Sequence, residues 1–117
     1  MLSPVLVAST DPARELAIMT VDGPLGDPRH TESLALALPA LPTGYGLVID
    51  LSSATELSAA SIEGLRAIAR DARSAGQRLI FVCSDLERRA ELVVANLDSL
   101  APVVETLEHA IPLAHAA

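Results

Sequence analysis

The sequence of this 117-residue chain predicts an α/β fold in which helices pack on a mostly parallel β-sheet. Short apolar runs, typical of buried strands, alternate with longer segments that repeat apolar residues every three or four positions. Strands that alternate with helices imply right-handed crossovers and a parallel sheet. The expected order of elements is ββαβαβαβα.

The first two strands are predicted at residues 4–8 and 16–21, joined by a turn at Asp11 and Pro12. Because the connection is short, the two strands are expected to pair as a hairpin. The second strand should end at Asp22, Gly23 and Pro24.

A first helix is predicted to begin with Asp27 as its N-cap and Pro28 at its first position, and to stop near Pro39. Residues 47–51 then form an apolar run without polar alternation. Such a run is expected of a central parallel strand covered on both faces.

The next helix is predicted to begin at the N-cap Ser58 and to end before Gly76, a residue suited to a left-handed C-cap. Its inward stripe repeats at helical spacing. The residues of that stripe are Ile62, Leu65, Ala69 and Ala72.

Residues 79–83 read as another buried strand, and Ser84 with Glu87 gives the capping-box pattern of a third helix. The apolar face of this helix is expected to point inward. That face consists of Leu86, Ala90, Val93, Val94 and Leu97.

A short strand at residues 102–104 and a last helix from about Thr106 complete the predicted fold. Pro112 lacks an N–H group for helical bonding, so the helix should end or kink near Ile111. The chain from Ala114 onward is expected to fray.

Length and composition predict one domain spanning residues 1–117, with a core of aliphatic side chains because Tyr45 and Phe81 are the only aromatic residues. The net charge is −7, and all eight basic residues are Arg. An acidic chain with so few aromatic residues lacks the features of nucleic-acid or anionic-membrane binding. A basic protein partner fits better, although surplus carboxylates also serve solubility alone.

The sequence contains no pattern typical of catalysis or of a cofactor or metal site. The single cysteine, Cys83, allows no intrachain disulfide and is expected to be buried. His30, His109 and His115 lack metal-ligand spacing and are expected at the surface. Without a nucleophile motif or phosphate-binding glycine loop, the chain is predicted to be no enzyme. Without a signal peptide or a long apolar run, it is expected to be cytoplasmic.

Residues 48–65 form the candidate functional segment, in which a strand, a Ser/Thr-rich turn and a helix start follow one another. This arrangement presents main-chain N–H groups and hydroxyls at one surface point. Asp50, at the strand end, is expected to accept hydrogen bonds from N–H groups of the turn.

Several motifs along the chain resemble the STAS family, the fold of bacterial anti-sigma factor antagonists. The motifs are VDGPLGD at 21–27, VIDLSSATEL at 48–57, GQRLIFV at 76–82, NLDSL at 96–100 and ETLEHAI at 105–111. The resemblance covers nearly the whole chain and implies a STAS-type single domain, a cytoplasmic protein-interaction module.

In this family a serine at the start of the second helix is phosphorylated by a kinase that doubles as an anti-sigma factor. The resemblance places that serine at Ala59, which cannot accept phosphate, and the preceding family aspartate at Ser58. The family glycine falls at Ser61. Ser58 and Ser61 are the substitute acceptors, and helix capping or first-turn packing are the structural alternatives for them.

The resemblance implies an anti-sigma factor antagonist-like regulator that binds an anti-sigma factor, kinase or related regulator without phosphorylation at Ala59. The alternatives are an accessory subunit docked on the ATPase of a lipid-transporting ABC system, a sensor of a small apolar ligand, and, for assembly, a homodimer. Glu56 and Glu63 flank Ala59 and would select a basic partner or imitate phosphate, unless they only favour the helix N-terminus. The predicted partner-binding residues are Ser52, Ser53, Thr55, Glu56, Ser58, Ala59, Ser61 and Glu63.

Overall fold

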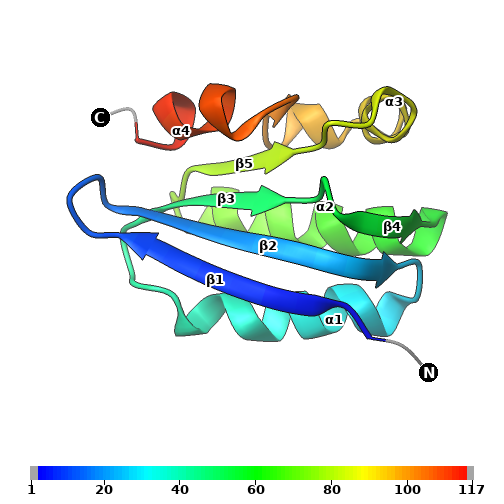
Figure 1. Ribbon diagram of the computed structural model, residues 1–117, viewed down its shortest axis with the longest axis horizontal. Coiled ribbons are helices and arrows are strands. Elements are labelled where there is room, and N and C mark those ends of the chain that lie inside the picture. The colour runs from blue at the N-terminus through cyan, green and yellow to red at the C-terminus, as the bar shows by residue number, and fades with distance from the viewer. Residues whose placement is uncertain (1–2, 116–117) are drawn as a thin grey trace.

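A computed structural model describes residues 3–115 as one six-stranded β-sheet with helices on both faces (Figure 1). The strands are β1 (Val5–Asp11), β2 (Leu16–Leu25), β3 (Gly46–Asp50), β4 (Ala54–Leu57), β5 (Leu79–Val82) and β6 (Val103–Val104). The α-helices are α1 (Pro28–Ala37), α2 (Ala59–Ser74), α3 (Leu86–Val94) and α4 (Leu107–His115). Two single 3₁₀ turns are η1 (Leu38–Ala40) and η2 (Leu97–Ser99).

The strand order is β1-β2-β3-β5-β6, and only the β1–β2 pair is antiparallel. The predicted α/β class with a mostly parallel sheet is therefore confirmed. The predicted order of elements lacks β4, which pairs with the end of β2. Because β4 pairs with its end, β2 does not stop at Asp22 as predicted but continues to Leu25. Within this extension Gly23 has a φ of 113°, in the left-handed region that glycine tolerates.

The central strands separate two apolar clusters, as the absence of polar alternation predicts. In β3, Leu47 and Ile49 pack into the main cluster with α1, α2 and Leu92, whereas Val48 packs into a smaller cluster with α4. The inward stripe predicted for α2 is confirmed. Gly76 follows that helix with a φ of 71°, as predicted for its end.

Helix α3 has the opposite orientation to the prediction. Leu92 is its only buried residue, and the predicted inward residues Leu86, Ala90, Val93 and Val94 are exposed. Only Leu97, in η2, is buried as predicted. The side that carries Leu92, Arg88 and Arg89 faces inward instead, and the two arginines donate hydrogen bonds to the main-chain carbonyl groups of Thr55 and Cys83.

The N-cap of α3 is Asp85 and not Ser84. The Asp85 carboxylate accepts from the N–H groups of Glu87, at 2.9 Å, and Arg88, at 3.4 Å. Two first-turn donors are thereby satisfied from a position one residue closer to the helix than Ser84. The capping box predicted between Ser84 and Glu87 is therefore wrong.

Helix α4 continues through Pro112 to His115, so of the two outcomes predicted near Ile111, an end or a kink, the end is wrong. Ala110 and Ala114 are buried against the sheet, and this packing compensates for the one lost N–H donor. Gly46 allows the approach, because a Cβ there would overlap the carbonyl oxygen of Ala114. Ala114 is thus ordered in the helix, contrary to the predicted fraying. The same prediction for residues 116–117 lies outside the described residues.

Two of the other residue-level predictions are confirmed. Cys83 is buried, and burial raises the pKa of its thiol. His109 is exposed, whereas the side chain of His115 lies outside the described part of the chain. Within residues 3–115, no helix has the length and apolar character needed to cross a membrane.

Candidate partner-binding site

The turn between β3 and β4 is fixed by its own polar groups. Asp50 accepts a hydrogen bond from the N–H of Ser52 at 2.9 Å, as predicted. Ser52 and Ser53 are exposed, and the carbonyl of Ser53 accepts from the N–H of Gly23 at 3.1 Å. The turn is therefore attached to β2 through its main chain, which leaves both hydroxyl side chains at the surface.

Thr55 and Glu56 lie on β4 and not in an irregular turn, and both are exposed. Arg88 of α3 reaches under this strand. Its guanidinium group donates to the carbonyl oxygens of Ala54 and of Thr55, the latter at 2.8 Å. These bonds tie α3 to β4 across more than thirty positions of sequence.

Ser58 is the N-cap of α2, as predicted, and it shares a capping box with Ser61. The N–H of Ser61 donates to the Ser58 Oγ at 3.1 Å, and the N–H of Ser58 donates to the Ser61 Oγ at 2.8 Å. The Ser58 hydroxyl also donates to the carbonyl of Gly26 at 2.6 Å. Both hydroxyls are therefore occupied in holding the helix start.

The family phosphoacceptor position, Ala59, is exposed at the first residue of α2. Ser61 is fully buried, so its hydroxyl does not reach the surface. Glu63 is exposed one turn further along and forms an ion pair with Arg70 at 3.1 Å. The predicted site residues thus separate into an exposed set, the half-buried Ser58 and the buried Ser61, and the two serines hold the helix start.

A hollow of about 420 Å³ lies beside Ala59, between the start of α2 and α3. Its lining is Leu57, Ser58, Ala59, Ile62, Glu87, Ala90, Glu91, Val94 and Ala95. Beside it on α3, Val94 is 83% exposed and Leu86 is 69% exposed. Sequence reasoning missed the α3 side of this site, because the apolar residues of α3 were assigned to the core.

The acidic groups of the hollow are Glu87 and Glu91, and no basic residue contributes to its lining. The neighbouring cations, Arg88 and Arg89, donate to main-chain carbonyl groups instead. The hollow is therefore apolar at its floor and negatively charged at its margin.

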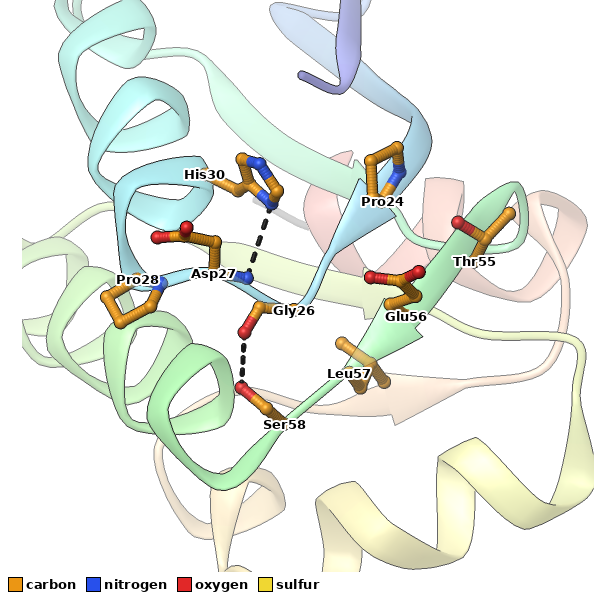
Figure 2. Close-up of a pocket in the computed structure, with 9 residues that line it drawn as sticks. All are labelled: Pro24, Gly26, Asp27, Pro28, His30, Thr55, Glu56, Leu57 and Ser58. Carbon is orange, nitrogen blue, oxygen red and sulfur yellow. Dashed lines mark hydrogen bonds between the residues drawn. The ribbon is translucent and has the colours of Figure 1, made fainter. Parts of the chain in front are cut away.

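A second, open hollow of about 720 Å³ lies where the starts of α1 and α2 meet (Figure 2). Its lining is Pro24, Gly26, Asp27, Pro28, His30, Thr55, Glu56, Leu57 and Ser58. Figure 2 shows the Ser58 hydroxyl reaching Gly26 and the His30 ring reaching Asp27. The loop 26–27 therefore joins the caps of the two helices.

His30 is buried, which contradicts its predicted surface position. Its Nδ1 accepts from the N–H of Asp27 at 3.3 Å and completes the capping box of α1. The sequence signal was present, because His30 stands three residues after the N-cap, but histidine is not the Glu or Gln usual at that position.

Asp27 caps α1 as predicted and carries the largest electrostatic perturbation of the site. The Arg29 side chain donates to its carboxylate at 2.9 Å, and this hydrogen bond, more than any other cause, lowers the pKa of Asp27 to about 2. The N–H of Arg29 also donates to the same carboxylate at 2.9 Å. Asp27 therefore stays ionised at neutral pH. Among residues 3–115, no group of three or more His, Cys, Asp or Glu residues is placed to hold a metal ion.

No family model and no curated protein matches this sequence. Solved structures do match its fold. The NMR structure of TM1081 is similar with a TM-score of 0.77 at 15% identity, covering 100% of this chain and 94% of that one. The crystal structure of TM1081 is described as a candidate anti-sigma factor antagonist from Thermotoga maritima. It has a TM-score of 0.78 at 15% identity, covering 93% of both chains.

The anti-sigma factor antagonist SpoIIAA in its unphosphorylated form is also similar. Its TM-score is 0.65 at 13% identity, and the match covers 97% of this chain and 100% of that one. The chain therefore has the STAS-type fold of the anti-sigma factor antagonists, as its sequence predicts.

Proposed function

We propose that this chain, as a single domain of residues 1–117, is a non-enzymatic, cytoplasmic regulator of the anti-sigma factor antagonist type. It binds an anti-sigma factor, a kinase of that kind or a related regulator. The contact surface combines the exposed residues of the predicted site with the outward face of α3.

The apolar hollow beside Ala59 is the observation that carries this proposal. Water-exposed apolar residues gathered around a cavity are typical of a binding surface. Val94 is exposed and lines the cavity together with Ile62 and Leu57. Leu86, also exposed, stands one turn before the lining residue Ala90 on the same helix face. A complementary partner presents an apolar segment flanked by basic residues, since Glu87 and Glu91 provide the charge of the hollow.

We further propose that binding is not switched by phosphate. Ala59 has no hydroxyl, and the two neighbouring hydroxyls are engaged in the capping box of α2. Phosphate on Ser58 would break its 2.6 Å bond to Gly26 and add about −1.5 to −2 charge beside Glu56. Ser58 and Ser61 are therefore structural residues.

The test pairs partner binding with phosphate transfer. Candidate anti-sigma kinases, including any encoded beside this gene, are mixed with the chain and ATP, and the product is mapped by mass spectrometry. Binding is measured in parallel by calorimetry. Binding without phosphate incorporation is the expected result.

Two variants make the assay decisive. Ala59→Ser restores an exposed hydroxyl at the family position and should gain phosphate, whereas Ala60→Ser, also exposed, should not. Phosphate on Ser58 or Ser61 of the unaltered chain, with loss of binding, contradicts the unswitched mode. Co-purification with a transporter ATPase and no kinase contradicts the proposed partner class.

A further inference from the structure

The outer edge of β1, away from the hollow beside Ala59, plays no part in the proposed function. Among residues 3–115, β1 is the terminal strand of the sheet and pairs only with β2, so no described strand pairs with the main-chain groups of its other edge (Figure 1). At the opposite end of the sheet, β6 has only two residues. One edge is therefore short and the other is seven residues long.

Exposed edges usually carry a charged residue, a proline or a bulge that prevents pairing with another chain. In β1 these features stand only at the ends: Pro4 precedes its first residue and Asp11 is its last, whereas residues 5–10, VLVAST, have neither charge nor proline. Its register with β2 is uninterrupted from the Val5–Asp22 pair to the Asp11–Leu16 pair. The chain has a net charge of −7, so two copies repel each other over most of their surfaces. Residues 5–10 carry no charge, so this repulsion is weakest along β1.

The strand also exposes apolar side chains. Leu6 packs against the main cluster, so the alternating residues Val5 and Val7 face the other side of the sheet. Helix α4 covers that side over β3 and β5. Beyond its reach, Val5 is 59% exposed and Val7 is 55% exposed.

We propose that the β1 edge binds the β1 edge of a second copy of this chain, in antiparallel orientation about a two-fold axis at Val7. This register places Val7 opposite the partner's Val7, which joins two apolar side chains on the exposed face, and places Val5 opposite the partner's Ser9. The sole charged residue of β1, Asp11, falls opposite the partner's Ser3. A parallel pairing would set two Asp11 carboxylates side by side, and a register centred on Ala8 would set Asp11 against Val5.

The pairing goes beyond the proposed function and leaves its surface open, since no residue of β1 lines the hollow beside Ala59. A strand edge of seven residues is a small contact for a permanent complex, so the dimer should be reversible. The assembly is bivalent and presents two partner-binding surfaces.

Sedimentation velocity over a wide range of protein concentration tests the dimer without any partner. The mass should rise from 12.2 kDa toward twice that value. Val7→Lys should weaken association by about tenfold or more. Leu36→Lys, the same change at an exposed site of α1, should leave association unchanged.

Cysteine cross-linking tests the register. Opposed residues in antiparallel strands have Cα atoms about 4.5–5.5 Å apart, within disulfide range. The two Ser9 positions would be about 13 Å apart, beyond that range. Val7→Cys should therefore form a linked dimer on mild oxidation, and Ser9→Cys should not.

A chain that stays monomeric with an unlinked Val7→Cys variant overturns the proposal. A dimer that persists in Val7→Lys but is lost in Val94→Asp overturns it too, because association would then use α3. A monomeric chain leaves the proposed function untouched, because the kinase assay measures partner binding separately. Association through α3 would instead compete with the partner for the same surface.

Discussion

Helices α2 and α3 have similar amphipathic sequences and opposite orientations. In α2 the apolar stripe is buried, with Leu65 at 0% exposure. In α3 the apolar face is at the surface, and Leu92 alone is buried. In both helices the half-buried arginines that donate to main-chain carbonyl groups lie on the inward side. In α2 this is Arg66, one turn from Ile62 of the apolar stripe. In α3 these are Arg88 and Arg89, on the side that carries the buried Leu92.

An apolar helix face therefore marks either the core or a binding surface, and the position of the carbonyl-bonded arginines relative to that face distinguishes the two cases. A guanidinium group bonded to carbonyl oxygens is compatible with an inward position. The apolar face of α3 is then left for another molecule. Mutations matched between the two helices test this directly.

The largest effect is expected from truncating buried and exposed leucines in parallel. Leu65→Ala should lower the free energy of unfolding by about 2–5 kcal/mol, because it removes a wholly buried side chain. Leu86→Ala should change it by no more than about 0.5 kcal/mol. Urea denaturation followed by circular dichroism measures both. Equal losses would mean that α3 buries its apolar face in solution.

The caps of the two helices give the next effect. Ser58→Ala removes the acceptor of the Ser61 N–H and the donor to Gly26, and should cost about 1 kcal/mol. Ser84 stands where a cap was predicted for α3. Ser84→Ala should lower the free energy of unfolding by only about a few tenths of a kcal/mol, because Asp85 caps the helix. A loss of stability in Ser84→Ala as large as that in Ser58→Ala would show that Ser84, and not Asp85, caps α3.

The start of α2 depends on the loop 26–27, and this dependence gives a pH effect smaller than that of a cap. The folded-state pKa of Asp27 is about 2, below the usual 3.8, so its carboxylate stabilises the fold above pH 3.8. That contribution should be lost as the pH falls from about 4 to about 2. Asp27→Asn should flatten the stability profile in this window. Asp71→Asn, an exposed change of equal charge, should keep its shape.

The smallest change in stability, with the largest contrast in binding, is expected at the outer face of α3. Val94→Asp adds a third acid next to Glu91 and Glu87 and should leave unfolding within about 0.5 kcal/mol of the parent chain. Affinity for the partner should fall at least tenfold, as calorimetry would detect. Leu36→Asp on α1, equally exposed, is the matched control. An unchanged affinity for Val94→Asp would exclude α3 from the interface.

Local patterns in the sequence were sufficient to predict most of the fold. Unbroken apolar runs predicted β3 and β5, and Ser58, Asp27 and Gly76 predicted the ends of helices, because each of these features acts within a few residues. β4 was missed because Ala54–Leu57 has no strong strand pattern. Its pairing with β2 depends on contacts more than twenty positions away.

The candidate site was predicted in part, for the same reason. The α2 side follows from one continuous segment, in which Ser58 caps the helix and Ala59 and Glu63 are exposed as predicted. Ser61, predicted to contact the partner, is buried instead, and Thr55 lies on β4 and not in the turn. The α3 side depends on Arg88, whose bonds to Ala54 and Thr55 are non-local. The periodicity of residues 86–94 contains no information about those bonds. The outward orientation of Val94 could therefore not be predicted from the sequence.

The bonds of Arg88 also govern the thermodynamics of association. They clamp α3 to β4, and β4 leads directly into Ala59, so the two walls of the hollow are already held together before a partner arrives. A preorganised surface loses little conformational entropy on binding. Association should therefore proceed by rigid docking, and Arg88→Ala should reduce affinity through a larger entropic penalty while leaving the contact residues themselves unchanged.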